Sequence, residues 1–105
     1  MLSLTETDNG RALALRPEET IRISLPENAA AGYRWSIEHF DQDVVEALAT
    51  EPRYASKAVG SGGEVTFSFK ARKVGTGQIA LKYWRDWEGE SSVSKRYQVT
   101  LNVKA

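Results

Sequence analysis

Apolar and polar residues alternate along most of this chain, and no other feature of the sequence restricts its fold as strongly. In residues 21–25, 33–37 and 65–71 every second side chain is apolar, and the residues between them are polar. Successive side chains of a β-strand point to opposite faces of a sheet, so a period of two predicts strands with one buried face. The same alternation recurs in residues 79–83 and 97–103, which extends the prediction almost to the C-terminus.

The remaining segments are shorter and less regular. Leucine pairs within 2–4 and 13–15 predict two opening strands, and the turn-forming residues 8–10 lie between them. A turn is predicted at 41–43; the segment after it would suit a short helix or a strand, but Pro52 would end a helix, so we predict a strand. About seven or eight short strands without a long helical period predict an all-β fold, an immunoglobulin-like antiparallel β-sandwich.

Size and charge narrow the possibilities further. A chain of 105 residues is long enough for one hydrophobic core, so we expect a single domain spanning 1–105. Fourteen basic residues balance fourteen acidic ones, so the chain has no basic field for nucleic acid. No apolar run approaches the roughly 20 residues that cross a bilayer. We expect a monomer with no nucleic-acid or membrane partner, either cytoplasmic or the mature form of an exported protein.

The supply of reactive side chains argues against catalysis. The chain has no cysteine and one histidine, His39, so it has neither a thiol nucleophile nor a second imidazole for acid–base chemistry. His39 is expected at the surface. Asp41, Asp43 and Glu46 are too few and too loosely spaced for a calcium loop. We therefore predict that the protein is not an enzyme and has no metal site and no cofactor.

Three connections have distinctive compositions. Residues 26–32 are mostly small, residues 60–63 read Gly-Ser-Gly-Gly, and residues 84–90 carry two tryptophans and an arginine. In a sandwich whose strands alternate in direction, connections two apart along the chain emerge at the same end. We expect these three loops to open at one end, where a rigid scaffold can present binding residues.

The loops and their order resemble those of the chagasin family of cysteine-peptidase inhibitors. That family carries Asn-Pro-Thr-Thr-Gly followed by aromatic-x-Trp, then Gly-x-Gly-Gly, then Arg-Pro-Trp. This chain has Asn-Ala-Ala-Ala-Gly-Tyr-Arg-Trp at 28–35, Gly-Ser-Gly-Gly at 60–63 and Tyr-Trp-Arg-Asp-Trp-Glu at 83–88. It departs from the pattern where three alanines replace Pro-Thr-Thr and where Asp86 replaces proline.

The resemblance implies a reversible competitive inhibitor of papain-like cysteine peptidases that closes the active-site cleft with three loops. The first loop would enter the centre of the cleft, the second would cover its non-primed side and the third its primed side. The residues implied in peptidase binding are Asn28, Ala29, Ala30, Ala31, Gly32, Gly60, Ser61, Gly62, Gly63, Arg85, Asp86 and Trp87.

Several of these side chains also have ordinary structural explanations. Trp35 is expected to be a core anchor of the sandwich, whereas Trp87, in a polar hairpin, is expected to face solvent and contact a partner. Trp84 and Arg85 stay open between local packing and partner contact, and Gly32 fits either a turn or a binding loop. The alternative function is an immunoglobulin-like adhesion or scaffold module that binds protein or glycan through exposed aromatics.

Overall fold

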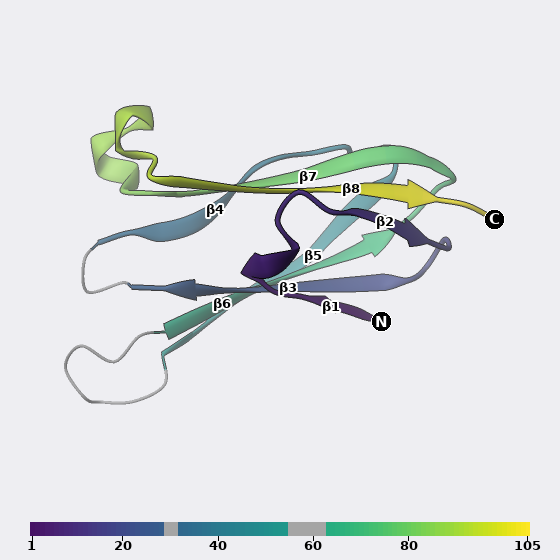
Figure 1. Ribbon diagram of the computed structural model, residues 1–105, viewed down its shortest axis with the longest axis horizontal. Helices are drawn as coiled ribbons and strands as arrows, with labels where there is room; N and C mark the ends of the chain where they lie inside the picture. The colour runs from purple at the N-terminus through teal and green to yellow at the C-terminus, as the bar shows by residue number, and fades with distance from the viewer. Residues whose placement is uncertain (29–31, 55–62) are drawn as a thin grey trace.

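Two four-stranded sheets pack face to face in the computed structural model, which describes residues 1–28, 32–54 and 63–105 (Figure 1). The strands are β1 (Leu2–Leu4), β2 (Ala12–Leu15), β3 (Thr20–Glu27), β4 (Arg34–Phe40), β5 (Val45–Tyr54), β6 (Gly63–Ala71), β7 (Gly75–Trp84) and β8 (Lys95–Val103). One sheet has the order β1-β3-β6-β5 and the other β2-β8-β7-β4. Three short 3-10 turns complete the described secondary structure: η1 (Glu6–Asp8), η3 (Asp86–Glu88) and η4 (Glu90–Ser92).

The predicted β-sandwich is confirmed, with eight strands in the described part of the chain. The sheets are not wholly antiparallel: β1 pairs with β3 in parallel, and β2 pairs with β8 in parallel. The opening segment changes from one sheet to the other through η1, so each of its two short strands lies beside a strand that runs in its own direction. The central pairs β3–β6, β5–β6, β7–β8 and β4–β7 are antiparallel, as predicted.

The segment that could have been a helix is the edge strand β5. A turn precedes it at 42–44, which agrees with the expected turn. Pro52 lies within this strand, which pairs on one side only, with β6. An edge strand can accommodate a proline because every second backbone N–H points to solvent rather than to the neighbouring strand. A β-bulge at Leu48 leaves that side chain 49% exposed.

The inward rows of both sheets form one core. Most of its fully buried members come from β3, β6, β7 and β8, the four central strands, and the edge strand β5 contributes Val45. They include Ile21, Ile23, Leu25, Phe67, Phe69, Ile79, Leu81, Val99 and Leu101. Phe40 of β4 meets Phe69 of β6 edge to face, with ring centroids 5.8 Å apart, so aromatic contact joins the two layers. Among the described residues no helix is long and apolar enough to cross a membrane.

Replacing Phe69 by alanine should remove one of the largest contacts between the layers. Phe69 has no exposed surface, so Phe69→Ala is expected to lower the free energy of unfolding by about 3–5 kcal/mol. Urea denaturation followed by tryptophan fluorescence measures this loss. Leu48→Ala is the control, because Leu48 is half exposed on the edge strand and its truncation should cost far less. Equal losses in the two variants would contradict the assignment of the core.

Candidate functional site

The strands that flank the three predicted loops end side by side. Glu27, the last residue of β3, pairs with Gly63, the first residue of β6, and so does Tyr54 at the end of β5. In the other sheet Arg34, the first residue of β4, pairs with Trp84, the last residue of β7. In each sheet, therefore, the described residues that flank the predicted loops lie at the same end of the strands.

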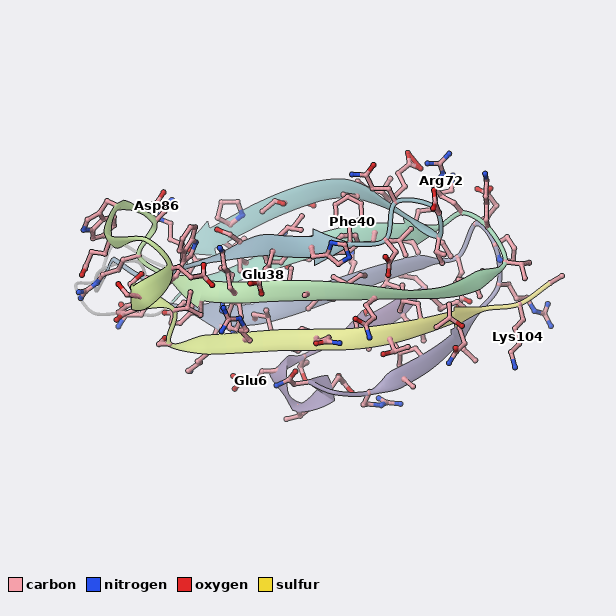
Figure 2. The ribbon with its side chains drawn as sticks, turned by 90° about the horizontal axis from the view of Figure 1, so that it is seen from above. Glu6, Glu38, Phe40, Arg72, Asp86 and Lys104 are labelled. Atoms are coloured by element: carbon pink, nitrogen blue, oxygen red, sulfur yellow. The ribbon has the colours of Figure 1, made fainter. Side chains whose placement is uncertain are left out.

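One hydrogen bond brings these two strand ends together across the sandwich. The backbone N–H of Asn28, directly after β3, donates to the hydroxyl oxygen of Tyr83 in β7 at 2.9 Å. Figure 2 shows Asp86 at the end of the molecule opposite to Arg72 and Lys104. The described flanks of all three loops thus lie at one end, as the alternation of strand directions predicts.

Half of the predicted peptidase-binding residues can be placed. Those that the structure describes are Asn28, Gly32, Gly63, Arg85, Asp86 and Trp87. Ala29, Ala30, Ala31, Gly60, Ser61 and Gly62 lie outside the described residues, and their role stays a prediction.

The third loop folds into two consecutive 3-10 turns, η3 and η4, with Gly89 between them at φ 80°. Ser92 closes this unit. Its Oγ accepts a hydrogen bond from the N–H of Arg85 at 3.0 Å and lies 2.8 and 2.7 Å from the carbonyl oxygens of Arg85 and Gly89, to which it can donate. A compact turn of this kind holds its side chains in place better than an open hairpin end.

Trp87 is both exposed and locally supported. Its side chain is 68% exposed, which agrees with the expectation that it faces solvent. The edge of its indole ring lies against Gly32. A Cβ atom added to Gly32 would lie only 2.5 Å from Cη2 of Trp87, which is too close. Gly32 also has φ +83°, a backbone conformation that other residues rarely adopt. Glycine at position 32 therefore satisfies both the turn and the close approach of the tryptophan.

Arg85 of the third loop contacts Tyr33, which directly follows the first loop. Its guanidinium carbon is 4.6 Å from the ring centroid of Tyr33, and its Nη1 is 2.9 Å from Oε1 of Glu88. A cation over an aromatic face and a carboxylate at its side hold the arginine in one orientation. Of the two interpretations left open for Arg85, local packing is thus present in the free protein.

Aromatic side chains form a support beneath the loops. Tyr83 stacks on Tyr33 with ring centroids 5.3 Å apart and lies 5.0 Å from Trp35. The indole N–H of Trp35 donates to the carbonyl oxygen of Pro26 at 2.9 Å, and the side chain is 7% exposed. The predicted role of Trp35 as a core anchor is confirmed. Trp84 is partly buried, and its indole N–H donates to Oγ of Ser36 at 3.1 Å.

Glu27 is a buried carboxylate that the sequence did not single out. It is 4% exposed, and its Oε2 accepts a hydrogen bond from the backbone N–H of Trp35 at 3.3 Å. Burying a carboxylate is costly unless hydrogen bonds satisfy it. The sequence placed Glu27 in the 26–32 connection, but β3 extends to Glu27, so the connection begins later than predicted. Because Glu27 ends β3 and Trp35 lies in β4, this bond ties together the two strands that carry the first loop.

A network of charges braces η4 against the neighbouring strands. Glu90 Oε2 lies 3.0 Å from Nζ of Lys82, and its Oε1 lies 2.5 Å from Nη2 of Arg96. Arg96 also pairs with Glu38 of β4 at 3.2 Å, and Lys82 lies 3.7 Å from the ring centroid of Trp84. Hydrogen bonding from Lys82, aided by Arg96, lowers the pKa of Glu90 below its ordinary value.

The sequence and the fold match those of known peptidase inhibitors. Residues 14–101 match the family model described as chagasin family peptidase inhibitor I42. The sequence is 33% identical over 105 residues to chagasin from Trypanosoma cruzi. This alignment covers 95% of this chain and 96% of chagasin. The chain belongs to the chagasin family of peptidase inhibitors. The family predicted from the loop motifs is confirmed, and it is a family of inhibitors rather than of enzymes.

Solved structures agree with this assignment. The crystal structure of the cysteine protease inhibitor EhICP2 from Entamoeba histolytica superposes with a TM-score of 0.86 at 26% identity, covering 98% of this chain and 95% of that one. PbICP-C, solved in complex with falcipain-2, superposes with a TM-score of 0.73 at 17% identity, covering 99% of this chain and all of that one. The second likeness supports the fold alone.

The residues that support the loops were the ones that sequence reasoning missed. Tyr33 and Tyr83 were assigned to inward positions of strands, and nothing in the alternation showed that they stack on each other or reach the loops. Glu27 was assigned to the 26–32 connection, and the one available signal is that the alternation of 21–25, if continued by two residues, turns Glu27 inward. Such roles depend on contacts between segments far apart in the sequence.

Glu90 should make the third loop sensitive to acid. Because the pKa of Glu90 is lowered on folding, its ionised form stabilises the folded state above the ordinary value of 4.5, and this contribution disappears as pH falls through the lower folded value. Glu90→Gln is therefore expected to lower the melting temperature slightly at neutral pH and to match the wild type well below pH 4.5. Thermal melts across this range measure the difference.

Glu51→Gln is the control for the loss of one negative charge. Glu51 is exposed on β5 and forms no ion pair within the described ranges. Its replacement should leave the melting temperature unchanged at every pH. A Glu90→Gln variant that melts like the wild type at neutral pH would show that the network does not stabilise η4.

Proposed function

We propose that this protein is a reversible competitive inhibitor of papain-like cysteine peptidases. Residues 28–32 enter the centre of the active-site cleft, residues 60–63 cover its non-primed side, and Arg85, Asp86 and Trp87 cover its primed side. The observation that carries the proposal is the exposed indole of Trp87 lying over Gly32, which unites the third loop with the first at one end of an inhibitor-family fold.

Shape and chemistry support binding at this end. Trp87 offers a large rigid apolar surface, 68% exposed and already supported by its neighbours, and tryptophan is favoured as an interface anchor. The small residues at 29–31 would let the main chain of the first loop approach the floor of a narrow cleft. A standard interface buries about 800 Å² on each partner, which three loops at one end can provide.

Binding without cleavage follows from rigidity. A substrate is cut when its scissile carbonyl reaches a near-attack geometry with the nucleophile. A loop whose flanks are held by the sandwich can lie close to the catalytic cysteine without adopting that geometry. Preformed loops also lose little conformational entropy on association, so the complex can be tight.

The names of the relatives support a peptidase as the partner. EhICP2 is described as a cysteine protease inhibitor, and PbICP-C was solved in complex with falcipain-2. The competing interpretation, an adhesion or scaffold module, would use the same exposed aromatic but is not favoured by family membership.

A titration tests the proposal directly. Increasing amounts of the protein are added to papain or a cathepsin, and cleavage of a fluorogenic peptide is followed. We expect the rate to fall to zero at saturation, with inhibition relieved by higher substrate concentration. Failure to inhibit any papain-like enzyme would refute the proposed function.

Trp87→Ala should weaken inhibition with little change in stability. The indole is mostly exposed in the free protein, so its loss removes contact area with the peptidase rather than core packing. A hot-spot tryptophan contributes about 2 kcal/mol or more, which corresponds to a rise in the inhibition constant of about 30-fold. Val74→Ala, which truncates a side chain 60% exposed at the opposite end, should inhibit like the wild type. A large drop in the melting temperature of Trp87→Ala would assign the indole a structural role instead.

Restoring the family pattern in the first loop should tighten inhibition. Proline at position 29 would restrict the free loop, an effect of about 0.4–1 kcal/mol where the conformation is compatible. Threonine hydroxyls at 30 and 31 can each form a hydrogen bond worth about 0.5–1.5 kcal/mol. The variant Ala29→Pro, Ala30→Thr, Ala31→Thr is expected to bind about 10- to 100-fold more tightly, mostly through slower dissociation. If the triple variant inhibits no better, the first loop is not the segment that enters the cleft.

A further inference from the structure

Tyr83 contacts the first loop at its point of entry. Its hydroxyl oxygen accepts the backbone N–H of Asn28 at 2.9 Å, although the two residues are 55 positions apart in the sequence. Asn28 directly follows β3, which belongs to one sheet, whereas Tyr83 belongs to β7 of the other sheet. This bond is therefore a cross-link between the two layers at the first residue of the loop.

The ring that carries this hydroxyl is held on several sides. Tyr83 is 9% exposed, stacks on Tyr33 at 5.3 Å and lies 5.0 Å from Trp35. The Nζ atom of Lys95 on β8 lies 5.6 Å from its centroid. A side chain packed in this way has little rotational freedom, so its hydroxyl is a fixed acceptor for the loop.

The exit of the same loop is held from the same direction. Gly32 packs against the indole of Trp87, and Nε of Arg85 is 3.6 Å from the position that a Cβ of Gly32 would occupy. Both described ends of the first loop, Asn28 and Gly32, are thus fixed by β7 or by the segment that directly follows it. The separation of the two ends depends on one structural unit.

We propose that Tyr83 is a positioning residue for inhibition, whose hydroxyl holds the entry of the first loop in its binding conformation. This inference rests on the proposed function. Tyr83 itself is too buried to form much of an interface, and it acts through Asn28. Without the hydroxyl, the free loop samples more conformations, and the peptidase selects the competent one at a cost in affinity.

Tyr83→Phe removes the hydroxyl and keeps the aromatic stack. Because a hydrogen bond of this kind contributes modestly, we expect the inhibition constant for papain to rise about 2- to 10-fold. In the free protein, the amide hydrogen of Asn28 should exchange with solvent faster by a similar factor, measured by NMR. This second measurement needs no peptidase.

Tyr97→Phe is the matched control. Tyr97 is 2% exposed on β8, and its hydroxyl donates to the carbonyl oxygen of Thr5 at 2.9 Å rather than to a residue of the first loop. Burial raises the pKa of Tyr97 to about 12, so this hydroxyl stays protonated and able to donate. The control should lose stability comparably but leave both inhibition and the exchange of Asn28 unchanged.

The outcomes separate the two proposals. A selective loss of inhibition and faster Asn28 exchange in Tyr83→Phe support the positioning role. If the wild type inhibits papain and both variants inhibit as well as the wild type, the role of Tyr83 is refuted while the proposed function stands. The same conclusion follows if both variants lose potency only in proportion to their loss of stability. If the wild type inhibits no papain-like enzyme, the proposed function is refuted, and the positioning role with it.

Discussion

The close packing of two sheets through their inward rows is the constraint on which the rest of this molecule depends. Without disulfides, the domain is held by fully buried side chains such as Ile21 and Phe69 in one sheet and Leu81 and Leu101 in the other. Close packing of such side chains fixes the register of every central strand, because a shift by one residue would turn the apolar row outward. Fixed register in turn fixes where each strand ends, and those ends carry the loops.

At the loop end, two hydrogen bonds join the layers beside the first loop. The Tyr83 hydroxyl accepts the N–H of Asn28, and the buried carboxylate of Glu27 accepts the N–H of Trp35. Each bond joins β3 or the residue after it to a strand of the opposite sheet. The described flanks of the first loop are therefore joined to both sheets, which suits the proposed entry of this loop into a peptidase cleft.

The third loop combines a rigid base with an exposed tip. Ser92 closes its two turns, and the network around Glu90 ties it to the neighbouring strands, so Trp87 is displayed to solvent from a fixed support. Individual surface ion pairs contribute little, but Glu90 is held by two cations at once and one of these also reaches β4. The described third loop thus combines an exposed indole with polar bracing from its own segment.

The sequence by itself determined the class of fold, the order of the strands from 20 to 103 and the family, because alternation and loop motifs are local patterns that survive without contacts. It also assigned Trp35 to the core and Trp87 to solvent, from their places in a strand and in a polar turn. Only the tertiary structure decided that the opening strands pair in parallel, that Gly32 lies under Trp87, and that Tyr83 reaches Asn28. These features join residues that are far apart in the chain. The packing of the two sheets decides which distant residues meet, and a local sequence pattern carries no information about that packing.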